Sequence, residues 1–134
     1  MDGIAETLER HGIRRYLINA GGDIRARRCK EGGQPWAVAV QDPEGGDGYV
    51  DEIALATGAV ATSGSYREHF DEDQDLHHIV DGRIGRSPRH AASVSVVAPT
   101  AIAADALATS VFVLGPDTGI DLVERLRGLS LIHI

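Results

Sequence analysis

Residues 93–116, SVSVVAPTAIAADALATSVFVLGP, constrain the fold more than any other stretch of the chain. The first six are rich in β-branched side chains, which predicts a strand over 93–98. Thr100 then offers a side-chain oxygen at the N-cap of a helix expected over 101–114. Gly115 followed by Pro116 is typical of a helix end. A strand that leads directly into an apolar helix indicates that the helix packs on a sheet.

The rest of the chain reads as short strands between helices. Hydrophobic patterning predicts helices over 2–11 and 118–127, and strands over 16–20, 24–26, 36–41, 49–55, 59–62 and 76–81. The segments 43–48 and 71–75 read as surface connections, the second of them acidic. A helix, several strands and then helices favour an α+β fold with a largely antiparallel sheet and flanking helices.

Composition restricts the possible functions. The 134 residues suit one domain or a part of one. A formal net charge of −7 without a basic stripe disfavours nucleic acid or an anionic membrane as the main partner. No apolar run is long enough to span a membrane. Cys29 is the only cysteine, which excludes an internal disulfide and any multi-cysteine metal site.

The last six residues, LSLIHI, fit poorly after a helix closed by Gly128. They resemble the in-frame translation of a transposase mosaic-end sequencing adaptor, and the alternative is a short apolar strand. We interpret residues 1–128 as the domain and leave 129–134 out of the functional reasoning.

Asp105 and Thr109 form one candidate site, because residues four apart on a helix share a face. We expect Asp105 at a partly buried boundary, where a carboxylate needs a partner. Magnesium, which takes oxygen ligands, would be one. The alternative is that Asp105 favours the positive end of the helix dipole and Thr109 bonds back to a preceding carbonyl. Taken alone, the pair favours the alternative.

The histidine pair in HHIVD is a second candidate. On a strand, His77 and His78 point to opposite faces, while His77, Ile79 and Asp81 share one side. One of the histidines is a candidate base or hydrogen-bond donor near neutral pH. The alternative, one buried histidine and one exposed, has equal weight. A zinc site is not indicated, because HExxH is absent.

Two small-residue blocks complete the candidates. Paired glycines in NAGGDI, residues 19–24, allow close approach of a ligand to the backbone, or simply form a tight turn. The hydroxyls and glycine of ATSG, residues 61–64, offer donors to phosphate or ring carbonyl oxygens, or form an ordinary turn. Each block alone favours the turn.

The order of the four blocks, NAGGDI, ATSG, HHIVDGRIG and SVSVVAPTAIAADALATSVFVLG, closely resembles the C-terminal part of the ApbE family, the FAD:protein FMN transferases. The similarity covers nearly all of residues 1–128, and the last two blocks are the specific ones. The resemblance implies magnesium-dependent transfer of FMN from FAD to a Ser or Thr hydroxyl of a target flavoprotein, with release of AMP.

The resemblance also implies site residues. The family's metal-binding Asp and Thr correspond to Asp105 and Thr109, with a backbone carbonyl near Ile102 as a further ligand. The family's catalytic histidine corresponds to His78. The residues that match blocks near the flavin are Asn19, Gly21, Gly22, Asp23, Thr62, Ser63 and Gly64.

Two departures from the family pattern shape the expectations. Residues 81–85 read DGRIG where the family usually has DPRTG, so we expect a less constrained turn. The N-terminal half of the family domain has no counterpart, so we expect the chain to be inactive unless completed. A magnesium-dependent FAD pyrophosphatase and a non-enzymatic flavin-binding domain stay open as alternatives. Bacterial members are commonly exported, periplasmic or membrane-anchored, but an export signal would lie outside this sequence.

Overall fold

The computed structural model describes residues 1–43, 48–66, 70, 76–126 and 128–133. The helices are α1 (Asp2–Arg10), α2 (Ala101–Leu114) and α3 (Pro116–Glu124). The strands are β1 (Tyr16–Ala20), β2 (Asp23–Arg27), β3 (Trp36–Gln41), β4 (Tyr49–Leu55), β5 (Gly58–Gly64), β6 (Ser93–Ala98) and β7 (Ser130–His133). The α+β fold with antiparallel strands is therefore confirmed.

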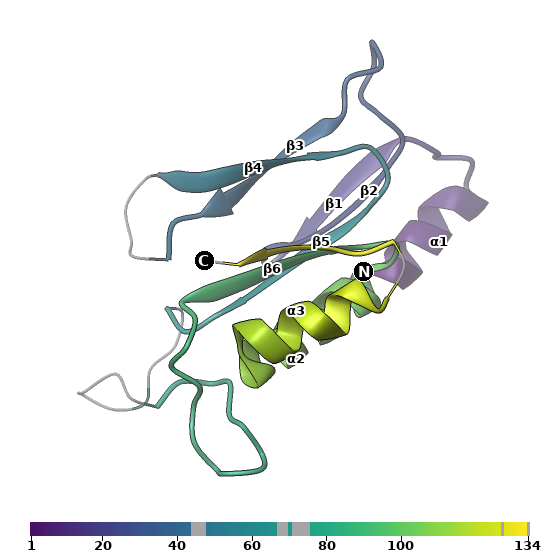
Figure 1. Cartoon of the computed structure of the whole chain (residues 1–134). Coiled ribbons are helices and arrows are strands. Elements are labelled where there is room, and N and C mark those ends of the chain that lie inside the picture. Colours follow the sequence, from purple (N-terminus) through teal and green to yellow (C-terminus); the bar gives the residue numbers. More distant parts are fainter. Residues whose placement is uncertain (44–47, 67–69, 71–75, 127, 134) are drawn as a thin grey trace.

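The elements form three layers (Figure 1). A five-stranded sheet in the order β1-β2-β5-β6-β7 lies in the middle, and every neighbouring pair is antiparallel. The helices cover one face of this sheet, and the separate β3–β4 hairpin covers the other. We call these the helix face and the hairpin face. Side chains alternate along each strand, so successive residues of β5 serve opposite faces.

The core of the helix face is built around Phe112, which is fully buried against Val94 and Val96 of β6. Nearer the start of α2 the packing changes to alanine, with Ala104 against Ala59 and Ala98. Small side chains at these positions let the first turns of α2 approach the sheet closely.

The hairpin face has a separate core. Val38 of β3 and Leu55 of β4 pack on Ala26 and Val60 of the central sheet. This apolar contact holds the hairpin, which among the described residues pairs with no strand of the sheet.

Three local predictions differ from the structure. Residues 76–81 form no strand, because side-chain hydrogen bonds replace a ladder there and the segment has only isolated bridges, such as that between Asp81 and Arg86. α3 begins at Pro116, two residues before the expected start, since proline is well suited to the first helical turn. It ends at Glu124, three residues before the expected end.

Residues 130–133 pair with the central part of β6, from Val97 opposite Ser130 to Val94 opposite His133. The strand alternative for the LSLIHI segment is therefore confirmed at the level of structure. An adaptor origin concerns the gene and stays a prediction. The central residues of the 43–48 connection, the acidic segment 71–75 and Arg127 lie outside the described residues.

Candidate functional site

Asp105 lies near the N-terminal end of α2, on the rim of a cavity of about 330 Å3. Asp23, from the start of β2, and Ile102 line the same cavity. The carboxylate of Asp105 is exposed, so the expected partly buried position is wrong. The reason is that α2 buries its alanines, Ala104 and Ala108, against the sheet, and Asp105 falls beside that buried stripe.

Thr109 joins two of the predicted blocks. Its Oγ1 lies 2.9 Å from Oγ of Ser63 on β5, a hydrogen bond between residues 46 positions apart. The hydroxyl that bonds back within α2 is Ser110, which donates to the carbonyl of Ala106. The structure thus brings Thr109 and Ser63 together on the helix face, whereas the cavity at Asp105 is lined by other residues.

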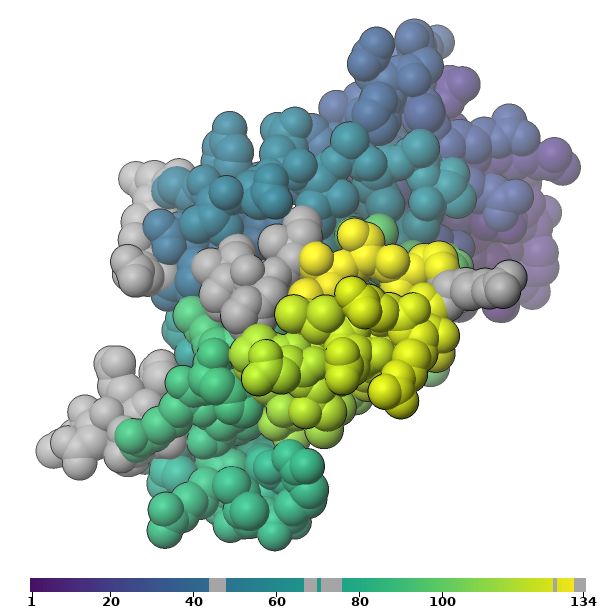
Figure 2. All heavy atoms as spheres, in the orientation of Figure 1, coloured from purple at the N-terminus to yellow at the C-terminus, as the bar shows by residue number. Residues whose placement is uncertain are grey.

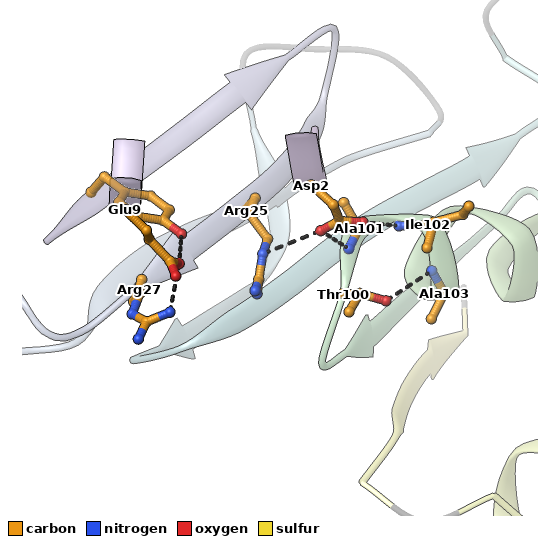
Figure 3. A network of polar contacts seen from close by, with 9 residues as sticks. Asp2, Glu9, Arg25, Arg27, Thr100, Ala101, Ile102 and Ala103 are labelled. Carbon is orange, nitrogen blue, oxygen red and sulfur yellow. Dashed lines mark hydrogen bonds and ion pairs between the residues drawn. The ribbon is translucent and has the colours of Figure 1, made fainter. Parts of the chain in front are cut away.

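The N-terminus of α2 carries a second carboxylate that the sequence did not reveal (Figure 3). Asp2, at the start of α1, accepts hydrogen bonds from the backbone amides of Ala101 at 3.0 Å and Ile102 at 2.9 Å. Thr100, the predicted N-cap, accepts from the amide of Ala103 at 3.3 Å. These contacts satisfy the first three amides of the helix, which have no partner within it.

Charge around Asp2 is balanced by Arg25 of β2, whose Nε lies 3.4 Å from Asp2 Oδ1. Burial raises the pKa of Asp2, but the amide hydrogen bonds from Ala101 and Ile102 and the charge of Arg25 outweigh it, so the pKa lies below its usual value. Near the C-terminal end of α1, Glu9 makes an ion pair with Arg27 of β2 (Figure 3). α1 is thereby fixed to β2 at both ends.

The glycine block forms the turn between β1 and β2. Gly21 and Gly22 have φ values of 68° and 106°, a backbone conformation that glycine adopts without strain. Asn19 Oδ1 accepts a hydrogen bond from the amide of Gly22 at 3.2 Å. The tight-turn interpretation is confirmed, and a ligand role for this turn stays a prediction.

Asn19, Gly22 and Thr62 line one small cavity of about 130 Å3, together with Val38 and Val40 of β3. This cavity lies on the hairpin face. The predicted flavin residues are therefore divided, with Ser63 and Asp23 on the helix face and Asn19 and Thr62 on the other.

Thr62 and Gly64 of β5 both lie close to residues outside that strand. Thr62 Oγ1 lies 2.7 Å from Oγ of the fully buried Ser95. A Cβ added at Gly64 would lie 2.4 Å from Cε1 of Tyr66 and 3.0 Å from the carbonyl oxygen of Ala92. Close approach, and not backbone conformation, therefore explains the glycine.

The two histidines have opposite environments. His77 is 2% exposed, its Nε2 lies 3.0 Å from the carbonyl oxygen of Pro88, and its Nδ1 accepts from the amide of Ile79 at 3.3 Å. Its ring also meets Phe112 edge to face at 5.6 Å. His78 is exposed. The expected alternation holds without a strand, and His78 is the histidine available to a substrate.

The DGRIG turn is closed by the contacts of Asp81, and its comparison with the family's DPRTG turn stays a prediction. Asp81 accepts hydrogen bonds from Nε and Nη2 of Arg83 and from its backbone amide, and the amide of Gly85 donates to the Asp81 carbonyl. The Arg83 hydrogen bonds hold the pKa of the Asp81 carboxyl at about 2. Arg83 thus constrains the turn in which proline is absent.

This turn belongs to a projecting segment, drawn in green in the space-filling view (Figure 2). A cavity of about 770 Å3 lies against it, lined by Leu76, Asp81, Arg86 and His90 among others, with Val113 of α2. The segment is anchored to α2, because His90 Nε2 lies 2.8 Å from the Phe112 carbonyl oxygen.

Within the described part of the chain, no group of three or more His, Cys, Asp or Glu side chains could hold a metal ion together. No helix in the same part is long and apolar enough to cross a bilayer. Protein ligands for a cation at Asp105 are therefore few.

The layers and the site define an α+β domain that presents carboxylates and hydroxyls at the N-terminal end of a sheet-packed helix. Residues 1–132 match the ApbE family, and the chain belongs to that family. It is 39% identical to an FAD:protein FMN transferase of Escherichia coli K12 over 99% of its own length and 38% of the relative's. A protein of the same name from Haemophilus influenzae is 36% identical over 93% of the chain and 37% of the relative.

Solved structures agree. The ApbE protein of Thermotoga maritima has a TM-score of 0.78 and 40% identity, covering 89% of this chain and 39% of that one. The flavin transferase ApbE of Vibrio cholerae has a TM-score of 0.78 and 30% identity, covering 99% of this chain and 42% of that one. The chain thus spans about two fifths of the length of the relatives it matches.

Proposed function

We propose that the protein containing this chain transfers the FMN moiety of FAD to a Ser or Thr hydroxyl of a target flavoprotein and releases AMP. Membership of the ApbE family and the names of the relatives support the reaction. The structural observation that carries the proposal is the exposed Asp105 carboxylate on a cavity at the N-terminal end of α2.

The donors present fit magnesium. Asp105, Asp23 and the backbone near Ile102 offer only oxygen ligands around the cavity. Magnesium is commonly bound through one or two carboxylates, with phosphate and water oxygens completing its shell, so a sparse protein set is suitable. When bound, the ion would neutralise charge on the pyrophosphate.

The chain's own residues have distinct roles in this proposal. Asp105 would hold the cation, and Ser63 fixes the orientation of the Thr109 hydroxyl, one helical turn further along α2, through their 2.9 Å hydrogen bond. His78, exposed and next to the buried His77, takes the proton of the incoming hydroxyl. The hydroxyl oxygen bonds to the FMN phosphorus as the phosphorus–oxygen bond to AMP breaks, so one phosphoester forms and one phosphoanhydride is lost.

The test is a chimera in which this chain replaces the matched segment of the E. coli relative. Given FAD, magnesium and an acceptor protein with a reactive Thr, it should yield covalent flavin fluorescence on the acceptor and an equal amount of AMP. FMN and AMP without labelled acceptor would instead identify a pyrophosphatase. FAD binding with neither product would identify a binding domain, and either result would overturn the transferase.

The chimera carrying Asp105→Ala is the control for magnesium. Its failure to label, with FAD fluorescence quenching unchanged, would separate loss of the cation site from loss of folding. The isolated chain should bind magnesium weakly.

A further inference from the structure

Asp2 occupies the N-terminal end of α2 although it lies 99 residues before Ala101 in sequence. Each of its carboxylate oxygens accepts one backbone amide, Oδ1 from Ala101 and Oδ2 from Ile102 (Figure 3). The aligned peptide dipoles give a helix N-terminus an effective charge of about +0.5. A full negative charge is therefore held against the positive end of α2.

A second positive charge lies beside it. The Arg25 side chain is 13% exposed and pairs with Asp2. Its Nε and Nη1 are buried without a hydrogen-bond partner in the described part of the chain. The charge of Arg25 also acts on Glu9, and Asp2 is the carboxylate within ion-pair distance of the Arg25 guanidinium.

The cation proposed at Asp105 would lie in this same neighbourhood. Asp105 is one turn into α2, and its cavity is also lined by Asp2, Ala101 and Ile102. The positive helix end and Arg25 both oppose a cation there. A helix N-terminus commonly attracts anions, so a metal ligand at this position needs compensation.

We infer that Asp2 supplies that compensation: its carboxylate makes the N-terminal end of α2 compatible with a divalent cation at Asp105. The inference rests on the proposed role of Asp105. Asp2 acts through its charge and not as a ligand, because both of its oxygens are directed at backbone amides. Arg25 has the opposite effect and weakens the same site.

Manganese(II) binding to the full 134-residue chain, followed by water-proton relaxation, tests the inference without an activity assay. Asp2→Asn keeps the side-chain shape and removes the charge, and we expect about fivefold weaker binding, the order for one charge near a divalent ion in a polar medium. Arg25→Gln should tighten binding by a similar factor. Both effects should shrink at high ionic strength.

Thr100→Ala is the matched control. It removes the third cap of α2 without changing charge, so it should lower Tm and leave manganese affinity within about twofold. If Thr100→Ala weakens binding as much as Asp2→Asn, Asp2 is only a cap and the inference fails. If Asp2→Asn does not fold, the manganese affinity of Arg25→Gln tests the inference instead. Tighter binding supports it, because the mere loss of a structural contact would not raise the affinity.

Asp105→Ala separates this inference from the proposed function. If Asp105→Ala abolishes saturable binding while Asp2→Asn and Arg25→Gln leave it unchanged, the cation site stands and the role of Asp2 is refuted. If the unaltered chain shows no saturable binding that depends on Asp105, both the cation site and the role of Asp2 are refuted.

Discussion

The two faces of the central sheet carry different chemistry although they share the same strands. On the helix face, Asp105 and Asp23 line a cavity of about 330 Å3. On the hairpin face, Asn19 and Thr62 line one of about 130 Å3. Charged oxygens gather on the first face, whereas neutral side chains line the second.

Because successive residues of β5 point to opposite faces, Thr62 and Ser63 make contacts on different faces of the sheet. Thr62 bonds to Ser95 on the hairpin face, and Ser63 bonds to Thr109 on the helix face. Ligand pockets usually have volumes of about 300–1,000 Å3, and the hairpin cavity as this chain forms it falls below that range. Under the proposed function we therefore expect phosphate and metal chemistry on the helix face, and we expect Thr62 to contribute through its hydrogen bond to Ser95.

Asp105→Ala should have the largest effect, a loss of about 1,000-fold in flavin transfer by the chimera, because several kcal/mol of charge stabilisation depend on the cation. Asn19→Ala, on the other face, should lose less than about tenfold. Covalent flavin fluorescence of the acceptor measures both. Equal losses would contradict the division between the faces.

The histidine pair should separate activity from stability. His78→Ala should slow transfer by about 100-fold or more, as for loss of a general base, and leave unfolding unchanged. His77→Ala should lower the free energy of unfolding by about 2–3 kcal/mol, because buried groups at Pro88 and Ile79 lose their partner. Urea denaturation beside the transfer assay tests this, and a stability loss in His78→Ala would contradict it.

The hydroxyls of β5 allow a crossed comparison. Thr62→Val leaves the buried Ser95 hydroxyl without this contact and should cost about 1–3 kcal/mol of stability with transfer retained. Ser63→Ala should cost about 1 kcal/mol and weaken magnesium binding through Thr109. Thermal unfolding measures the stability of both variants, and magnesium titration measures their affinity. If Thr62→Val weakens magnesium binding and Ser63→Ala does not, the site lies on the hairpin face.

The smallest effect belongs to Asp81, in the turn outside both faces. Its pKa of about 2 lies below the ordinary 3.8, so its contribution to stability is present above pH 3.8 and is lost as the pH falls toward 2. The Asp81→Asn variant has no carboxyl at this position, so its unfolding free energy should fall less than that of the unaltered chain between pH 3.8 and 2. Arg83 is largely exposed, so the difference between the two pH profiles should be small. If the two proteins have identical profiles of unfolding free energy against pH, the Asp81–Arg83 ion pair does not stabilise the turn.

Local sequence patterns were sufficient to predict much of this fold. The strand, the Thr100 cap and the helix over 101–114 were predicted from β-branching, capping and the Gly-Pro end, and the structure confirms all three. The strand over 76–81 was wrong, because alternating burial there comes from His77 and Ser87 bonding to backbone and not from a ladder. A period-two pattern does not distinguish these cases.

The site was less accessible from sequence. Spacing correctly put Asp105 and Thr109 on one helix, but no local signal links Asp2 to Ala101 or Ser63 to Thr109, since those contacts depend on how α1 and β5 pack. Alternation along β5 predicts opposite directions for Thr62 and Ser63, yet not that a hairpin would cover one face. An acidic residue at the first turn of α1 was the available hint to Asp2.

Pairing of β7 with β6 also bears on solubility. β6 is the most β-branched strand of the chain, and without β7 its row of backbone amides and carbonyls would form an open sheet edge. Open edges of this kind recruit strands from other molecules and start aggregation. Residues 130–133 cover that edge of β6, and we expect a chain trimmed of them to self-associate more than the full 134-residue chain.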